Sequence, residues 1–249
     1  MVKIFVTTIV ALIFAGCNTL DMKGLIIPTG EGVNSRFESS MSLNGNKSVA
    51  TITAEPNYMF YVCADPHIDS TSTNLRAFST QMRADAAALF GIVLGDCSDR
   101  RNALSNYVEA ITSEGSKPIF SLIGNHDLFF NGWVGFKEQV GPSVYWFEVA
   151  FPGGKDIYIS LDTATGTLGD KQNKWFRSFL EANRKNYRHC VIMTHTNFFY
   201  TDNSQVTSGN MPLEESFALI DFLGKQKVSL VLQGHDHYRE DLTYDNVRY

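Results

Sequence analysis

The segment Gly91 to Arg100, with the sequence GIVLGDCSDR, shows how the chain is organised, because a short apolar run ends directly in polar residues. The run GIVLG carries β-branched residues and is bounded by glycines, which is typical of a buried strand. Four similar runs lie along the chain, and each ends at a polar motif: YMFYVCA (58–64), PIFSLIG (118–124), CVIMTH (190–195) and SLVLQG (229–234). We therefore predict five buried strands with polar motifs at their ends.

Helical patterns separate these strands. Apolar residues recur at helical spacing over 75–89 and 104–111, and again over 175–180 and 212–223. Two further strands are expected at VYWFEV (144–149) and DIYISLD (156–162). Strands that alternate with helices predict an α/β fold with parallel strand pairs.

The polar motifs carry five of the six histidines. In open α/β sheets, ligands bind outside the carboxyl ends of the strands, so these motifs are expected to meet. Imidazole and carboxylate together are the ligands that borderline transition metals prefer, and two such ions held close together can drive in-line attack on a phosphate ester. The chain is therefore expected to be a dinuclear metal hydrolase. The motif residues are Asp65 and His67 (ADPH), Asp96 and Asp99 (GDCSDR), Asn125, His126 and Asp127 (GNHD), His195 (MTHT), and His235, Asp236 and His237 (GHDH).

The length and composition of the chain limit the number of domains and the kinds of partner. A chain of 249 residues with 44% hydrophobic residues can bury one large core, and no second domain is required. The net charge of −5 argues against a nucleic-acid partner, because binding to a phosphate backbone usually needs a basic face.

The N-terminal residues read as a targeting segment. A short basic start and an apolar run over 4–15 precede FAGC (14–17), which resembles the bacterial lipobox, whose cysteine is lipidated. We expect residues 1–17 to be a signal peptide ending at Cys17, so that the protein is exported and lipid-anchored at the bacterial cell envelope, at the outer membrane or the periplasmic face. The alternative is a plain secretory signal and a secreted protein. Residues 18–55 are expected to be a tether with one or two short strands near 48–54, and residues 56–249 to be the catalytic domain.

Three cysteines remain after Cys17. An odd number in an exported protein cannot form a closed set of disulfides. Cys63 and Cys190 lie in or beside apolar runs and are expected to be small buried hydrophobic residues. A thiolate ligand at Cys97 is conceivable, but the neighbouring Asp96 already supplies a hard oxygen.

Taken together, the motifs resemble the calcineurin-like metallophosphoesterase superfamily, whose pattern is DxH, GDxxD, GNH(D/E), a lone histidine and GHxH, over Tyr58 to Tyr238. The resemblance implies a four-layer α/β/β/α sandwich with two mixed β-sheets, in a bacterial lipoprotein-type member. Relatives usually continue past GHxH with strands that complete the second sheet, whereas only twelve residues follow His237 here. The end of the chain, LTYDNVRY (242–249), has strand character without a turn. We expect either a truncated protein or a sandwich that closes with fewer strands.

The resemblance also implies the ligand set and the chemistry. Two transition-metal ions, Mn, Fe or Zn, would hold a shared hydroxide that attacks the phosphorus. The first ion would be bound by Asp65, His67 and His237, the second by Asn125, His195 and His235, and Asp96 would bridge the two.

One motif histidine is left for proton transfer. His126 resembles the family's general acid for the leaving oxygen, and Asp99 would orient and charge its ring. Arg100 could bind substrate phosphate through its planar fork. Asp127 and Asp236 are expected to support the ligands rather than to react.

The sequence differs from two subfamilies at motif positions, which reduces the number of possible functions. Purple acid phosphatases place a tyrosine where Asp99 stands, and protein Ser/Thr phosphatases differ at Arg101 and Ile123. What remains is a phosphoesterase that cleaves a small-molecule phosphate mono- or diester at the cell envelope. A nucleotide- or phospholipid-specific enzyme is one alternative, and a surface binding lipoprotein with a vestigial metal site is another. The sequence selects neither the substrate nor an oligomeric state.

Overall fold

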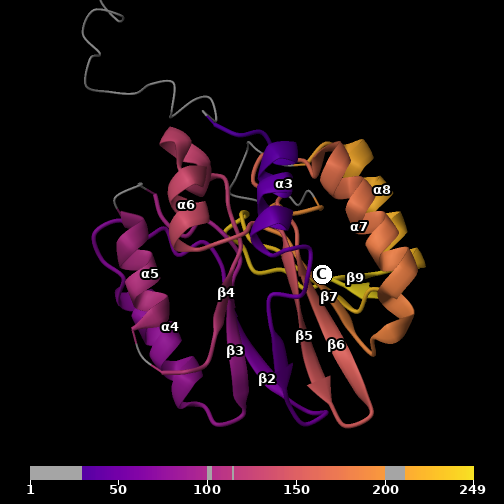
Figure 1. The fold of residues 1–249 in the computed structure, drawn as a ribbon, viewed down its shortest axis with the longest axis horizontal. Helices are drawn as coiled ribbons and strands as arrows, with labels where there is room; N and C mark the ends of the chain where they lie inside the picture. The colour runs from indigo at the N-terminus through magenta and orange to yellow at the C-terminus, as the bar shows by residue number, and fades with distance from the viewer. Residues whose placement is uncertain (1–29, 100–102, 114, 200–210) are drawn as a thin grey trace, which may run out of the picture.

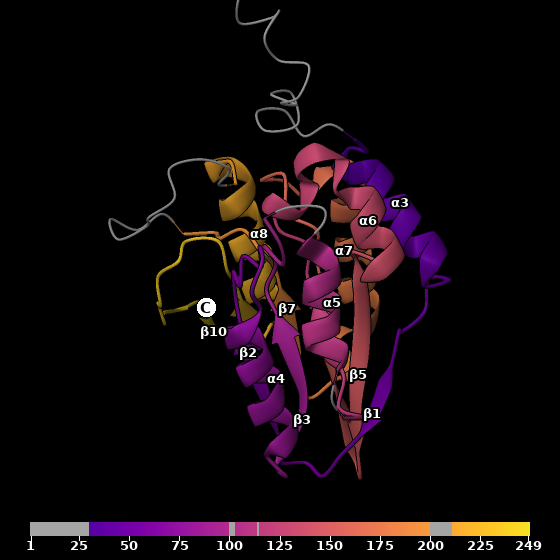
Figure 2. The ribbon, with the colours of Figure 1, turned by 90° about the vertical axis from the view of Figure 1, so that its left-hand side faces the viewer.

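Two β-sheets stacked face to face, with helices on both outer faces, form the protein (Figure 1). The computed structural model describes residues 30–99, 103–113, 115–199 and 211–249. Figure 2, turned by 90°, looks onto one of the two outer helical layers, with the sheets behind it. The predicted four-layer α/β/β/α sandwich is therefore confirmed.

The smaller sheet comes from the first half of the chain. Strands β2 (Met59–Cys63), β3 (Ala88–Val93) and β4 (Ile119–Ser121) are all parallel, so only the larger of the two sheets is mixed within the described residues. Helices α4 (Thr73–Ala84) and α5 (Leu104–Thr112) make the crossovers, and α6 (Trp133–Gln139) lies beside α5. The helix predicted over 75–89 ends at Ala84 because the backbone at Asp85 is extended and residues 88–93 form β3.

The larger sheet has the order β1-β5-β6-β7-β8-β10-β9. Strands β5 and β6 form an antiparallel hairpin, whereas β6, β7 and β8 are parallel and are connected through α7 and α8. The turn of the hairpin uses Gly153 at φ +90°, a conformation that glycine adopts without strain. The bounds are β1 Thr51–Thr53, β5 Tyr145–Phe151, β6 Gly154–Ser160, α7 Gly169–Asn183, β7 Cys190–Met193, α8 Leu213–Lys225, β8 Leu230–Leu232, β9 Thr243–Tyr244 and β10 Val247–Arg248.

Three apolar layers hold the sandwich together. The layer between the sheets is aromatic: Phe147 stacks on Phe120 at 3.8 Å and on Tyr158 at 4.7 Å between ring centroids. The other two layers lie under the helices on either side, around Tyr107 and around Phe176. Strands β3 and β7 are buried on both faces and are apolar without alternation, as their sequence runs predicted. β2, which was also predicted to be buried, lies at a sheet edge and is partly exposed.

The prediction of a tether before the first strand is wrong for residues 33–43. Residues Val33–Leu43 form a helix, α3, which packs against α7 and buries Arg36 and Phe37. Few apolar residues mark this helix, and one of its buried side chains is charged, so no amphipathic pattern announces it. β1, Thr51–Thr53, lies within the stretch where a strand was predicted. The predicted signal peptide and Cys17 lie outside the described residues.

The end of the chain contains a turn that the sequence analysis did not predict. β9 and β10 pair antiparallel around Asp245 and Asn246, which have φ of 48° and 61°. Positive φ at both central residues is the signature of a tight hairpin turn. β10 then adds to β8, so the larger sheet extends beyond the GHDH motif. Within the described ranges, none of the helices is long and apolar enough to cross a membrane.

Candidate metal centre

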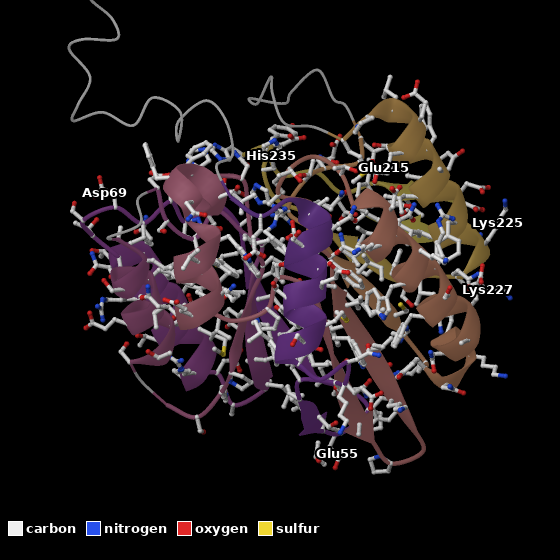
Figure 3. The ribbon with its side chains drawn as sticks, turned by 45° about the horizontal axis from the view of Figure 1, so that its top comes forward. Glu55, Asp69, Glu215, Lys225, Lys227 and His235 are labelled. Carbon is white, nitrogen blue, oxygen red and sulfur yellow. The ribbon has the colours of Figure 1, made fainter. Side chains whose placement is uncertain are left out.

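The motif residues meet at one end of both sheets. Asp65 and Asp96 follow β2 and β3 of the smaller sheet, and His195 and His235 follow β7 and β8 of the larger one. Figure 3 shows His235 at the end of the sheets opposite Glu55. The carboxyl ends of parallel strands therefore bring residues that are far apart in sequence to a single place, as predicted.

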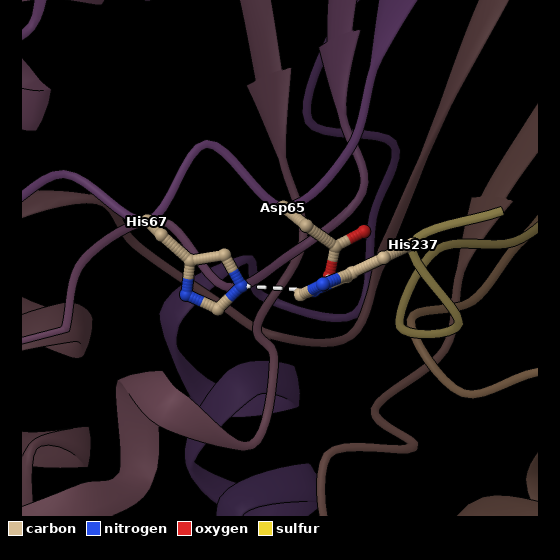
Figure 4. Close-up of side chains that lie close together, drawn as sticks. All are labelled: Asp65, His67 and His237. Atoms are coloured by element: carbon tan, nitrogen blue, oxygen red, sulfur yellow. Dashed lines mark hydrogen bonds and ion pairs between the residues drawn. The ribbon is translucent and has the colours of Figure 1, made fainter. Parts of the chain in front are cut away.

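Asp65, His67 and His237 form the first group of metal-ligand side chains, with one ligand atom of each within 4.8 Å of the others. The Nε2 atoms of His67 and His237 are 3.1 Å apart, and Figure 4 shows the two rings pointing towards each other, with the carboxylate of Asp65 beside the ring of His237. Both oxygens of Asp65 accept a hydrogen bond from the backbone N–H of His235, at 3.1 and 3.0 Å. Burial raises the pKa of Asp65, so a cation beside it would stabilise the carboxylate.

Asp96, His195 and His235 form the second group, and all three are buried. Nδ1 of His195 lies 2.8 Å from the carbonyl oxygen of Leu94, which can only accept, so Nδ1 carries the proton and Nε2 holds a lone pair. That lone pair faces the amide oxygen of Asn125 at 2.9 Å. Two acceptors this close repel each other unless a cation lies near both, so the donor set fits a metal ion.

Asp96 belongs to the second group and also faces the first. Its Oδ1 is 3.5 Å from Nε2 of His195, and its Oδ2 is 3.7 Å from Nε2 of His67. Oδ1 also accepts a hydrogen bond of 2.9 Å from the backbone N–H of His126, which fixes the carboxylate. One carboxylate thus presents an oxygen to each group.

The three motif glycines make room for these ligands. A Cβ on Gly95 would lie 2.6 Å from Nδ1 of His195, and a Cβ on Gly124 would lie 2.1 Å from Oδ1 of Asp96. A Cβ on Gly234 would lie 2.9 Å from Oδ2 of Asp65. The side chains of His195, Asp96 and Asp65 therefore each pack directly on the backbone of a motif glycine.

Five of the predicted ligands have left-handed backbone conformations: Asp65, His67, Asp96, His235 and His237, with φ between 44° and 75°. This region costs a residue other than glycine on the order of 1–3 kcal/mol and persists only where surrounding contacts hold it. Such strained residues cluster at functional sites. Here they turn the side chains of three different loops towards one another.

Asp99 lies between two histidines rather than beside one. Its Oδ1 is 3.0 Å from Nδ1 of His126, the histidine that the sequence pairs with Asp99. The same Oδ1 is 2.7 Å from Nδ1 of His67. A carboxylate on the outer nitrogen of a ligand histidine fixes its ring and its tautomer. The contact with His67 was missed because nothing in the motif spacing distinguishes the two histidines.

Asp127 ties two loops together and does not face the ligands. Its Oδ2 accepts from the backbone N–H groups of Gly124, at 2.9 Å, and of Cys97, at 3.1 Å, and its Oδ1 accepts from Ser98 at 3.1 Å. Burial and the nearby charge of Asp96 raise the pKa of Asp127 to about 7. The structure thus places it in the supporting position that the sequence suggested.

The remaining predicted residues are placed as follows. Burial raises the pKa of the Cys97 thiol well above its usual range, and its Sγ lies 3.4 Å from the carbonyl oxygen of Leu122, so it is a buried thiol rather than a thiolate ligand. Cys63, Cys97 and Cys190 form no disulfide in the described structure. Asp236 is buried and accepts a hydrogen bond of 2.8 Å from Asn197. Arg100 lies outside the described residues.

The sequence analysis missed one residue that supports the centre. Thr163 follows β6, and its Oγ1 accepts from the backbone N–H groups of His195, at 3.1 Å, and Thr196, at 2.9 Å. The run DIYISLD predicts a strand, but no histidine follows its end, so the sequence pattern assigns no motif there. The rule that placed the other motifs at strand ends would have found it.

Comparison with known proteins defines the class. The model of the family described as calcineurin-like phosphoesterase matches residues 58–239. The chain therefore belongs to the calcineurin-like phosphoesterase family, and the prediction of a metal-dependent phosphoesterase is confirmed at that level. No curated protein matches the sequence.

Solved structures with the same fold include three at low sequence identity. GAP50, the anchor in the inner membrane complex of Plasmodium, is 16% identical with a TM-score of 0.56, over 76% of this chain and 69% of that one. A dimetal phosphatase from Danio rerio is 14% identical with a TM-score of 0.55, over 78% and 86%. A purple acid phosphatase from yellow lupin is 16% identical with a TM-score of 0.51, over 73% and 38%. At these identities the likeness establishes the fold.

Proposed function

We propose that this protein hydrolyses small-molecule phosphate mono- or diesters at a dinuclear metal centre, and that it does so at the bacterial cell envelope. The observation that carries the proposal is the position of Asp96, whose two carboxylate oxygens lie 3.5 and 3.7 Å from histidines of two different ligand groups. Shared carboxylates of this kind hold two ions at the separation that suits in-line displacement, about 3.5–4 Å.

Each half of the centre has its own ligands. The donors are imidazole nitrogens, carboxylate oxygens and one amide oxygen, which suit Mn, Fe or Zn. When bound, two such ions act as Lewis acids that polarise a phosphoryl oxygen and acidify water. The proposed ligands are Asp65, His67 and His237 for one ion, Asn125, His195 and His235 for the other, and Asp96 for both.

His126 is the proposed proton donor to the leaving oxygen. With its Nδ1 held at 3.0 Å by Asp99, the opposite nitrogen, Nε2, is directed towards the centre, 4.0 Å from Oδ2 of Asp96. The side chain is about one third exposed, at 35%, so an incoming substrate can reach it. Proton transfer of this kind typically contributes about 10²–10⁴-fold in rate.

A cleft beside the first ligand group offers space for the organic part of the substrate. It has a volume of about 850 Å³, and its lining includes Asp65, His237, Phe199, Tyr238 and Arg239. Small-molecule sites usually measure roughly 300–1,000 Å³ and combine apolar walls with a few polar groups. We propose that the ester group lies at the metal centre and its substituent in this cleft.

Turnover of an aryl phosphate and a bis-aryl phosphate tests the reaction. We expect Asp96→Asn and His126→Ala to abolish or strongly reduce the hydrolysis of whichever ester the wild type cleaves. Asp221→Asn is the matched control, because this carboxylate is exposed and its one ion pair within the described ranges is with Lys225 of the same helix. If both site variants matched the wild type on both esters, the catalytic assignment would be wrong. A wild type that binds the ions without turning over any ester would favour the vestigial binding protein instead.

Cys17 and the apolar run before it support the cell-envelope setting. We expect the wild type to be labelled by a lipid precursor and to sediment with membranes, and Cys17→Ala to lose both properties. Unchanged membrane retention in Cys17→Ala would contradict the lipid anchor and leave the phosphoesterase proposal standing.

A further inference from the structure

We infer that Arg36, in α3, is a positioning residue for the second ligand group. The inference rests on the dinuclear centre proposed above, but it concerns a helix outside residues 58–239, which match the family. Three consecutive links connect Arg36 to His195: a buried ion pair, an immobilised loop after β6, and a hydroxyl that holds the backbone of the histidine.

The first link is the ion pair between Arg36 and Asp162. The guanidinium donates from Nε to Oδ2 and from Nη2 to Oδ1, both at 2.8 Å, and both side chains are buried, at 1% and 0% exposure. Its third nitrogen, Nη1, donates to the carbonyl oxygen of Glu31 at 2.8 Å. Two parallel bonds fix the plane of the carboxylate, which a lysine at this position could not do.

The second link is the loop that follows β6. Besides Arg36, the Asp162 carboxylate accepts from Ser143 Oγ, at 2.9 Å, and from the backbone N–H of Ala164, at 3.3 Å. The backbone of Asp162 is held in turn by the side-chain amide of Gln172, which bonds both its N–H and its carbonyl oxygen at 2.8 Å. Thr163, between Asp162 and Ala164, therefore has a fixed position.

The third link is Thr163 itself. Its Oγ1 accepts from the N–H groups of His195 and Thr196, and its carbonyl oxygen accepts from Thr196 Oγ1 at 2.7 Å. The position of the His195 ring depends on this backbone, because Nε2 must face Asn125 while Nδ1 bonds Leu94. Loss of the Arg36 fork frees the loop that sets the placement of His195.

The chain supplies a matched control. Arg188 also makes a bidentate pair with a buried aspartate, Asp156, and also donates through Nη1 to a backbone carbonyl, that of Pro56. Arg188 comes just before β7 begins, whereas His195 follows the end of β7. In the described part of the chain, Arg188 bonds Asp156 and Pro56, neither of which belongs to the metal centre. Arg188→Lys therefore weakens a bidentate pair of the same geometry, although with a more exposed guanidinium, without touching the path to His195.

The test is the affinity of the folded, full-length chain for Mn²⁺, measured by calorimetric titration. We expect Arg36→Lys to bind one of two ions about tenfold or more weakly, the effect typical of a partner that orients a metal ligand, while the other ion binds as in the wild type. Thr163→Val should reproduce the loss without altering α3, and the double variant should add little to it. Arg188→Lys should bind both ions as the wild type does. Thermal unfolding of each variant controls for stability.

Unchanged metal affinity in both Arg36→Lys and Thr163→Val would overturn the inference. Equal losses of metal affinity in Arg36→Lys and Arg188→Lys, in proportion to their lower melting temperatures, would overturn it as well. If Arg36→Lys does not fold, Thr163→Val provides the test. Normal affinity for both ions in Thr163→Val would show that the Thr163 hydroxyl does not position His195, and the inference would be wrong. A wild type that binds two ions and hydrolyses no phosphate ester contradicts the proposed function and leaves the positioning role intact. A wild type that binds fewer than two ions contradicts both.

Discussion

Gly124→Ala is expected to disable the centre by steric displacement of Asp96. The added Cβ would lie 2.1 Å from Oδ1 and 2.3 Å from the backbone nitrogen of Asp96, whereas ordinary contact begins at 3.4 Å. The two residues must therefore separate by about 1.3 Å. Gly124 does not have a positive φ, so an alanine at this position has no backbone strain. The effect of the substitution therefore comes from the steric contact alone.

The size of the effect follows from this displacement. Overpacking of a tight interior costs typically about 1–3 kcal/mol. For a chain of this length that corresponds to roughly 2–12 °C in melting temperature. A misplacement of about 1 Å in a catalytic constellation can cost on the order of 10²-fold in rate. We therefore expect a folded variant with a modestly lower melting temperature, weaker metal binding and at least about a hundredfold lower turnover.

Gly135→Ala is the control for this prediction. It lies within α6, where the new Cβ would meet Leu104 at an ordinary 3.6 Å, so binding and turnover should not change. Calorimetric metal titration and aryl ester hydrolysis, together with thermal unfolding, measure all three quantities. A folded Gly124→Ala protein with the metal affinities and turnover of the wild type would refute the claim that Asp96 requires a residue without a Cβ at position 124.

Three further predictions concern proton transfer, the core and acid stability. His126→Ala should lower turnover by about 10²–10⁴-fold with metal content unchanged, whereas Asp99→Asn should lower both, as metal analysis of the purified variants will show. Phe147→Ala should cost about 3–5 kcal/mol in urea unfolding, because the ring is fully buried between the sheets; a loss below 1 kcal/mol would contradict that packing. Burial tends to raise the pKa of Asp156, but the hydrogen bonds that this carboxylate accepts, led by those of Arg188, outweigh burial and lower the pKa. The pair therefore stabilises the fold above the unfolded-state pKa of an aspartate, about 4. This contribution is lost as the pH falls further. The deficit of Arg188→Met should therefore be largest at neutral pH and shrink below about pH 4 in urea titrations; a constant deficit would disprove this linkage.

The strands and the composition of the centre were predictable from the sequence. Each buried strand is a short apolar run, and the strand ends converge by a rule that holds for α/β sheets in general. Asp65 and His195 could therefore be assigned to one site although 130 residues separate them. The rule needs no knowledge of side-chain contacts, so it works without a structure.

The supports of the centre were not predictable in the same way. Left-handed φ at Asp65 or His237 has no sequence signature, because residues other than glycine adopt it only when the surrounding structure compels them. Arg36 reads as a solvated charge in a polar stretch, and its partner, Asp162, is 126 positions away. A buried charged residue breaks the apolar pattern by which a helix is recognised, so the sequence predicts a tether where α3 forms.

The number of metal ions bound per chain tests the central claim most directly. Native mass spectrometry of the full-length protein, stripped with a chelator and titrated with Mn²⁺ or Zn²⁺, counts them without reference to any substrate. Two ligand groups that share Asp96 predict two ions in the wild type and the loss of at least one in Asp96→Asn. A wild type that saturates with a single ion, or an Asp96→Asn protein that still binds two ions as tightly as the wild type, would contradict the dinuclear centre.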